Sequence, residues 1–238
     1  MATAASALKE LKAKGTEKNR ITYVRHGHAA DRVLGVSVAD MKAVAKSLKG
    51  QQTIAMELFA TGMLEPMYVA GIVADGAKMT RDELQAWVEG ASAMPMAADY
   101  TVPWVTVENA AGPELAMKWI ASKDDGVAAS GWASYSGLVA TRPDDALNLK
   151  EIETLLAKVA KEVHDAENRV RKAMNTFVIC VGSYVSLLSE AAKATAKKIG
   201  NVSVDVGDTA CKVPIALVYI AKVESMGRVG KKKKTLRC

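Results

Sequence analysis

Two carboxylates and two aromatic side chains lie close together near the middle of the sequence. The stretch reads Ala98-Asp-Tyr-Thr-Val-Pro-Trp104 and is followed by Glu108. Helical spacing places Tyr100, Trp104 and Glu108 on one face. An aromatic face attracts a cation, and a carboxylate such as Asp99 or Glu108 stabilises positive charge that develops in a reaction. The structural alternative is that the tryptophan fills the core and the carboxylates are exposed or cap the chain.

A second set of candidates lies later in the chain and suits phosphate and base contacts. Trp132 either faces a binding groove or packs between helices. Arg169, Arg171 and Lys172 stand on one side of a helix start, where they are placed to clamp phosphates. The alternative for these cations is pairing with the acidic residues that precede them: Glu162, Asp165 and Glu167.

One short motif resembles a known catalytic signature. Ile21 to Ala29 reads ITYVRHGHA, close to the strand followed by Arg-His-Gly of the histidine phosphatases, whose histidine is phosphorylated. That chemistry needs a second histidine at the end of another strand, and His164 is expected in a helix on a charged face. We therefore expect His26 and His28 to be capping or surface residues.

The sequence contains none of the common motifs that indicate a nucleotide cofactor or a catalytic zinc ion. There is no phosphate-binding glycine loop, dinucleotide-binding glycine turn or H-E-x-x-H pair. The three cysteines, Cys180, Cys211 and Cys238, are far apart and form no C-x-x-C pair, which predicts reduced thiols. We expect neither a cofactor nor a metal site.

Charge is distributed unevenly along the 238 residues, whose net charge is +6. Residues 1–50 carry 10 basic and 4 acidic side chains, residues 51–150 carry 6 and 13, and residues 151–238 carry 16 and 9. Basic ends that flank an acidic middle suit a polyanionic partner such as DNA, held by a salt-dependent interaction. The alternative, which the scattered lysines favour, is that these charges form the solvated faces of helices. The run Lys231 to Lys234 predicts a disordered basic tail over residues 227–238.

Apolar periodicity and capping residues predict an almost entirely helical chain. Ser37, Thr80 with Glu83, and Asn148 with Glu151 are expected to begin helices, and a break is expected near Pro103. The expected helices cover residues 5–14, 38–50, 51–60, 64–74, 80–88, 96–111, 113–120, 128–140, 148–163, 169–181, 184–199 and 214–223.

Only residues 201–206, NVSVDV, alternate like a short extended strand. No apolar run reaches the roughly 20 residues of a membrane-spanning helix, and the N-terminus lacks the apolar centre of a secretion signal. The sequence therefore predicts a cytoplasmic protein without a membrane partner.

Three short segments in a fixed order resemble a known family. They are Gly35-Val36-Ser37, the helix Ala55-Met-Glu-Leu-Phe-Ala-Thr-Gly62, and Glu65-Pro-Met-Tyr-Val-Ala-Gly71. The chain is similar here to the bacterial DNA alkylation repair family, whose HEAT-like fold is a right-handed stack of antiparallel helix pairs. The resemblance implies an all-α solenoid over residues 35–226, preceded by basic helices in residues 1–34 and followed by the tail 227–238.

The family includes glycosylases that release N3- and N7-alkylated purines from duplex DNA, and this implies a site built on the residues above. Family glycosylases place an aromatic residue and an aspartate four positions apart on one helix, with an arginine and a second aromatic on later helices. Tyr100 matches the first aromatic, but Trp104 stands at the aspartate position. The arginine position falls within residues 128–130, and the second tryptophan falls near Thr176 or Phe177.

These departures leave two functions open. The first is a DNA-binding protein of the alkylation-repair family, with Asp99 or Glu108 as the carboxylate of an N-glycosylase. The second is a non-catalytic helical-repeat scaffold that binds a protein partner or a branched nucleic acid. The acidic middle of the chain favours the second function, because its carboxylates would repel phosphate if they lined the groove.

Overall fold

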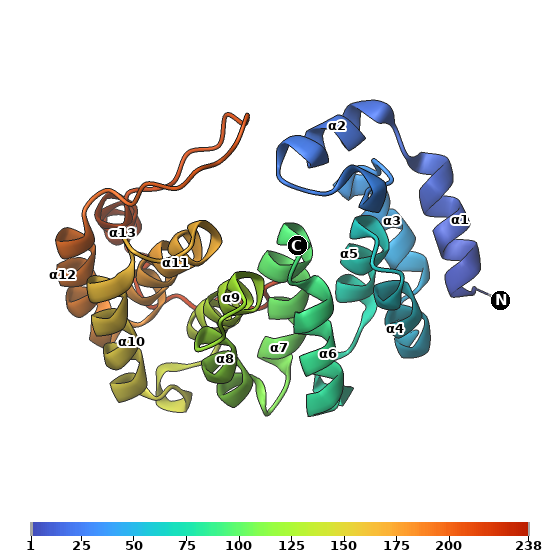
Figure 1. Ribbon diagram of the computed structural model, residues 1–238. Coiled ribbons are helices and arrows are strands. Elements are labelled where there is room, and N and C mark those ends of the chain that lie inside the picture. Colours follow the sequence, from blue (N-terminus) through green and yellow to red (C-terminus); the bar gives the residue numbers. More distant parts are fainter. Residues whose placement is uncertain (1, 238) are drawn as a thin grey trace. The chain divides into compact units, whose positions relative to one another are not determined.

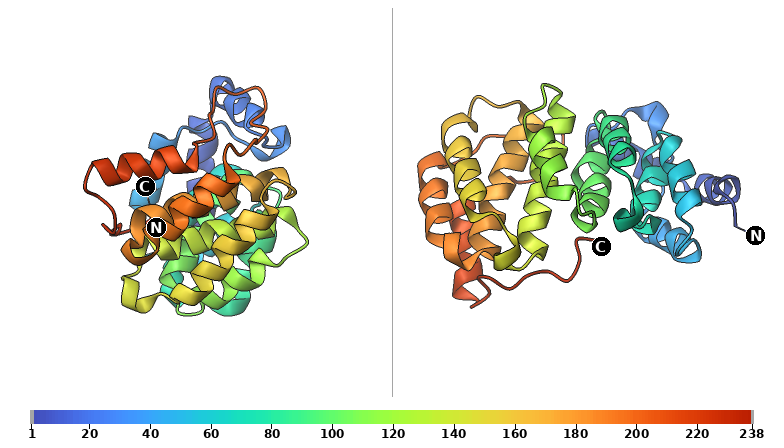
Figure 2. Two further views of the ribbon diagram at one scale, coloured as in Figure 1. Left: turned by 90° about the vertical axis from the view of Figure 1, so that its left-hand side faces the viewer. Right: turned by 90° about the horizontal axis from the view of Figure 1, so that it is seen from below.

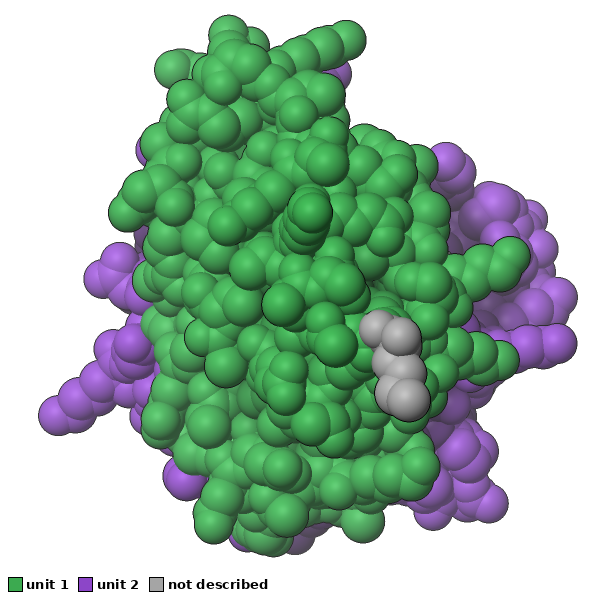
Figure 3. Space-filling model, turned by 90° about the vertical axis from the view of Figure 1, so that its right-hand side faces the viewer, with its two compact units in different colours: residues 1–111, 206–210, 237 green, residues 112–205, 211–236, 238 purple. Residues whose placement is uncertain are grey.

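The computed structural model describes residues 2–237, and within that range every regular element is a helix (Figure 1). The chain divides into two compact units (Figure 3). Unit 1 extends to Ala111 and also contains Val206–Ala210 and Arg237, while unit 2 contains Gly112–Asp205 and Cys211–Leu236. Each unit has its own hydrophobic core, and each is described separately below.

Unit 1 is built around one helix that is apolar on every side, α5. Nine of its ten residues are buried, and it contacts α1, α3, α4 and α7. A helix of this composition is stable only when neighbours cover it all round. The helices of unit 1 are α1 Ala4–Lys14, α2 Glu17–Arg25, α3 Val38–Ser47, α4 Gln52–Ala60, α5 Leu64–Val73, α6 Arg81–Ala91 and α7 Val102–Glu108.

The helix starts that the sequence predicts in unit 1 are confirmed. The Ser37 side chain accepts a hydrogen bond from the Asp40 amide at the start of α3. Thr80 and Glu83 form a reciprocal capping box at the start of α6. These short side chains satisfy amide groups that the first helical turn leaves without a partner.

The expected break near Pro103 takes the form of a wider helical turn. A π-helical segment, Ala97–Thr101, runs directly into α7, whose first turn contains Pro103. Thr101 is fully buried against α5, where a side chain at Gly71 would lie only 2.7 Å from the Thr101 methyl group. The widened turn determines which way Asp99 and Tyr100 project, and such turns are frequent at functional sites.

Unit 2 has two central helices, α9 and α11, which pack against each other. Helices in this unit also contact the helix two positions further along the chain; α10, for example, contacts α12. This is the pattern of stacked helix hairpins (Figure 2). The Asn148 cap is confirmed at the start of α10. The helices are α8 Gly112–Ile120, α9 Asp125–Thr141, α10 Leu149–Glu162, α11 Asn168–Tyr184, α12 Ser189–Ile199 and α13 Ala216–Ser225.

The structure differs from the sequence prediction at residues 201–206 and at His164. The expected strand at 201–206 is an irregular loop, since no strand lies beside it within residues 2–237. His164 lies in the turn after α10, where its Nε2 is 2.9 Å from the Ile199 carbonyl oxygen.

Across the described residues, no single helix combines the length and hydropathy of a membrane span. One pair of helical segments passes that test when the two are taken together, on length and composition alone. The pair is Asn168–Tyr184 and Ser186–Ile199, and it is bent by 115° at the break between them.

Candidate nucleic-acid interface

Tyr100 is the accessible aromatic side chain of the first candidate group. It is 47% exposed, and its ring centroid lies 6.2 Å from that of Trp104. Trp104 itself is only 2% exposed and packs edge-on against Tyr68 at 5.0 Å. The two rings do lie together, but only Tyr100 is available to a ligand, with the half-buried Asp99 beside it in the π-helical segment.

Glu108 lies at the end of α7, where its carboxylate already has two donors. Its Oε2 accepts a hydrogen bond from the Gly76 amide at 3.0 Å and one from Arg237 Nη2 at 2.5 Å. Arg237 also donates to the carbonyl oxygens of Ile72 and Ala74, at 2.8 and 2.6 Å. The Glu108 carboxylate therefore joins the ends of α5 and α7 through an ion pair, which is a structural role.

Trp132 is a core residue of unit 2 and not a groove residue. Its side chain is 1% exposed and meets Phe177 in a T-shaped contact at 5.2 Å. Phe177, near the position of the second family tryptophan, is fully buried. The structure corrects the assignment of Trp104 and Trp132 as base-contacting residues, because both are enclosed by neighbouring helices.

Arg171 binds the backbone of its own unit, which corrects both expectations for it. Its guanidinium donates to the carbonyl oxygens of Ala166 and Ser203, each at 2.9 Å. The nearby Glu162 is paired instead with Lys158 at 2.5 Å. Arg171 thus fastens the loop after α12, whereas Lys172, one position further along α11, is exposed.

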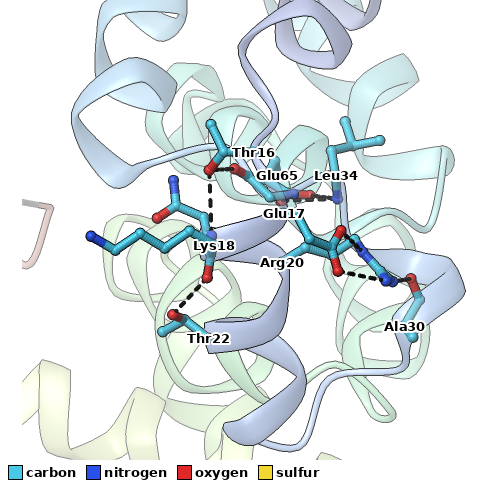
Figure 4. Close-up of polar contacts among 10 residues, drawn as sticks. Thr16, Glu17, Lys18, Arg20, Thr22, Ala30, Leu34 and Glu65 are labelled. Atoms are coloured by element: carbon cyan, nitrogen blue, oxygen red, sulfur yellow. Dashed lines mark hydrogen bonds and ion pairs between the residues drawn. The ribbon is translucent and has the colours of Figure 1, made fainter.

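The residue that the sequence analysis missed is Glu65, a buried carboxylate at the start of α5. It is 0% exposed and accepts hydrogen bonds from the amides of Leu34, Gly35 and Val36. Figure 4 shows Glu65 beside Leu34. Gly35 has φ +83°, a conformation that glycine adopts readily. Gly35 and Glu65 belong to two of the three segments on which the family resemblance rests. The order of these segments in the sequence was the signal that could have pointed to Glu65.

The α2 helix presents a basic surface outside the core of unit 1. None of its residues is buried, and it is attached through polar bonds such as Tyr23 Oη to the Val36 carbonyl at 2.7 Å. Burial of Tyr23 raises the pKa of its phenol to about 12, so this donor keeps its proton at neutral pH. Lys18 extends away from the Glu65 contacts in Figure 4, and Lys18 and Arg25 make no ion pair within residues 2–237.

The segment around His26 and His28 differs from a histidine phosphatase site and from a metal centre. The segment around His26 is helical, and His26 caps the end of α2 with Nδ1 2.8 Å from the Thr22 carbonyl. His28 is buried, contrary to the expectation of a surface residue, with Nδ1 3.1 Å from the Met94 sulfur. Among the described residues, no group of three or more His, Cys, Asp or Glu is arranged to hold a metal ion.

An all-helical chain of stacked hairpins with a basic N-terminal surface matches one family model, described as DNA alkylation repair enzyme, over residues 7–192. The chain belongs to this DNA alkylation repair family. Its relatives include uncharacterised proteins of Listeria innocua and Listeria monocytogenes, each 28% identical over 193 residues that cover 80% of this chain and 83% of the relative.

A solved structure matches the whole chain more closely. It is described as a new family of proteins related to the HEAT-like repeat DNA glycosylases with affinity for branched DNA structures. It is 34% identical, covers 100% of both chains and has a TM-score of 0.90. The all-α, HEAT-like fold expected from the sequence is confirmed by this match.

Proposed function

We propose that this protein binds DNA, with a preference for branched DNA, and does not excise bases. The observation that carries the proposal is the full-length similarity, at 34% identity and a TM-score of 0.90, to a protein with affinity for branched DNA structures. Access to chromosomal DNA implies a cytoplasmic location.

The chemistry of the candidate residues supports binding over base excision. A glycosylase needs a carboxylate free to stabilise a cationic sugar and an aromatic face to receive the alkylated base. Here Glu108 is paired with Arg237, and Trp104 and Trp132 are buried. Asp99, half-buried beside Tyr100, is the remaining carboxylate of the candidate group for the catalytic alternative.

The binding surfaces proposed here are exposed cations and one exposed aromatic ring. Lys18, Arg25 and Tyr100 serve unit 1, and the exposed Lys172 on α11 serves unit 2, whereas Arg169 on the same helix is half-buried. Each phosphate neutralised by a cation releases counterions, so affinity for DNA falls as salt rises. The proposed scaffold needs no cofactor, and a protein partner at the same surfaces is the competing interpretation.

The test compares a labelled four-way junction with a linear duplex of the same sequence, by fluorescence anisotropy over a range of salt concentrations. We expect the junction to bind about tenfold more tightly, a difference of about 1.4 kcal/mol. The paired change Lys18→Gln and Arg25→Gln should reduce the slope of log K against log salt by about 1.8.

The matched control is the pair Lys78→Gln and Lys158→Gln, whose ammonium groups already have carboxylate partners in Asp75 and Glu162. We expect this pair to leave the slope almost unchanged. Equal affinity for junction and duplex, or no binding of either, would overturn the proposal. A duplex bearing 7-methylguanine tests excision directly: release of free base, abolished by Asp99→Asn, would establish the glycosylase instead.

A further inference from the structure

The basic C-terminal segment has fixed contacts within unit 2, in contrast to the disordered tail expected from its composition. The Gly230 amide donates to the Ser183 carbonyl at 3.0 Å, and the Lys233 amide donates to the Ala140 carbonyl at 2.8 Å. Lys232 Nζ donates to the Val139 carbonyl at 3.0 Å and pairs with Asp144 at 2.8 Å. The backbone is thus held against the C-terminal ends of α9 and α11.

This arrangement fixes the backbone of the lysine run while leaving two of its ammonium groups to solvent. Lys231 and Lys234 are exposed and make no ion pair among residues 2–237. Gly230 permits the close approach, since it has φ +78° and a side chain there would lie 2.1 Å from Ser186 Oγ. Anchoring the backbone reduces the conformational entropy that the run loses when its lysines bind a polyanion.

Two tyrosines lie next to this anchored run. Lys233 Nζ lies 5.6 Å from the centre of the Tyr184 ring, at the end of α11. Burial raises the pKa of the Tyr184 phenol, and the nearby Lys233 ammonium group acts to lower it. The two helices meet closely at Gly182, where a side chain would lie 2.5 Å from Ile220. Tyr219 therefore belongs to the same small surface as Tyr184 and Lys233.

The outer face of α13 extends this surface with apolar side chains. Tyr219 is 47% exposed, Val218 is 64% exposed, and Ile215 just before the helix is 46% exposed. Residues 215, 218, 219 and 222 follow one side of the helix, and Lys222 adds a further exposed cation. Exposed apolar surface bordered by polar side chains is typical of an interaction site.

We propose that Tyr219, Tyr184 and the anchored lysines form a binding platform for unpaired, single-stranded nucleotides. The alternation of aromatic rings and cations suits single-stranded nucleic acid, because bases stack on the rings while lysines contact the phosphates between them. A base-paired duplex does not offer its base faces to Tyr219. The biological setting, unpaired nucleotides at the branch point of a DNA, rests on the function proposed above, but the platform itself is tested separately.

The test measures binding of fluorescently labelled oligothymidylate to the full-length protein by anisotropy. We expect Tyr219→Ala to weaken binding about tenfold, whereas Tyr219→Phe, which keeps the stacking ring, should stay close to the unaltered protein. The paired change Lys231→Gln and Lys234→Gln should reduce the slope of log K against log salt by about 1.4. The matched control is Lys197→Gln with Lys198→Gln, two exposed cations in the last turn of α12, which should leave that slope unchanged.

Failure of this proposal is distinguishable from failure of the proposed function. No binding of oligothymidylate by a protein that binds the four-way junction would overturn the platform alone. An equal loss in Tyr219→Ala and Tyr219→Phe, or an unfolding midpoint lowered in either variant, would also overturn it. If polyglutamate binds in place of oligothymidylate and is lost in the lysine variant, the surface fits an acidic protein and not nucleic acid.

Discussion

Glu65 is the residue on which the packing of the N-terminal part of unit 1 depends most. Its buried carboxylate accepts bonds from the amides of Leu34, Gly35 and Val36. Replacement by alanine leaves these amides without an acceptor, and we expect Glu65→Ala to lower the free energy of unfolding by at least about 3 kcal/mol. Urea titration measures this, with the exposed Glu57→Ala on α4 as the control. Equal effects of the two changes would contradict the role given to Glu65.

Gly35 and Gly50 provide a second comparison at the level of single residues. Both have positive φ, at +83° and +79°. A side chain at Gly35 would lie 2.2 Å from the Thr16 carbonyl oxygen, whereas nothing lies within 4 Å of one at Gly50. We expect Gly50→Ala to cost about 1 kcal/mol, the strain of the backbone alone, and Gly35→Ala to cost about 3 kcal/mol or more. Similar costs in urea unfolding would show that the contact with Thr16 relaxes freely.

Helix boundaries could be predicted well where a side chain caps its own helix. The signals at Ser37, Thr80 and Asn148 act over three residues, so they are visible in the sequence. The loop at 201–206 could not be predicted, because its bonds to Asn168 and Arg171 span 37 and 32 residues. Alternating residues form a strand only beside another strand, and none is present among the described residues.

The candidate site was harder to predict than the helices for the same reason. Spacing placed Tyr100 and Trp104 together, but which of the two rings is exposed depends on Tyr68, from a different helix. The negative charge of Glu108 is compensated by the guanidinium group of Arg237, 129 residues away in the sequence. Exposure and charge compensation are tertiary properties, and local spacing does not contain them.

Arg237 connects elements that are distant in the sequence, and its removal should destabilise unit 1. Its guanidinium group donates hydrogen bonds to the carbonyl oxygens at the end of α5 and forms an ion pair with Glu108. We expect Arg237→Ala to lower the free energy of unfolding by about 1–3 kcal/mol. The exposed Lys234→Ala should change it by less than about 0.5 kcal/mol. If both variants unfold at the urea concentration of the unaltered protein, the ion pair with Glu108 contributes nothing to stability.

At the scale of the whole molecule, the two units share one property, phenols that hold their protons tightly. Burial raises the pKa of Tyr23 in unit 1 to about 12. In unit 2 burial raises the pKa of Tyr135, and its hydrogen bond to Glu151 raises it further. Burial also raises the pKa of Tyr184. A folded-state pKa above the unfolded value means that the stabilisation is complete below pH 10 and is lost as pH rises further, because only the unfolded chain then releases the proton.

The raised pKa values predict that the protein loses stability at alkaline pH. Replacing one of these tyrosines should reduce that loss. Between pH 10 and 11 the buried Tyr135 phenol should lower the free energy of unfolding by about 1 kcal/mol. Tyr135→Phe removes one titrating group, so it should start less stable at pH 9 through loss of the bond to Glu151, and then lose less than the unaltered protein by pH 11. Urea unfolding at these pH values measures both curves. Parallel curves would mean that Tyr135 releases its proton as readily in the folded chain as in the unfolded one, which its burial argues against.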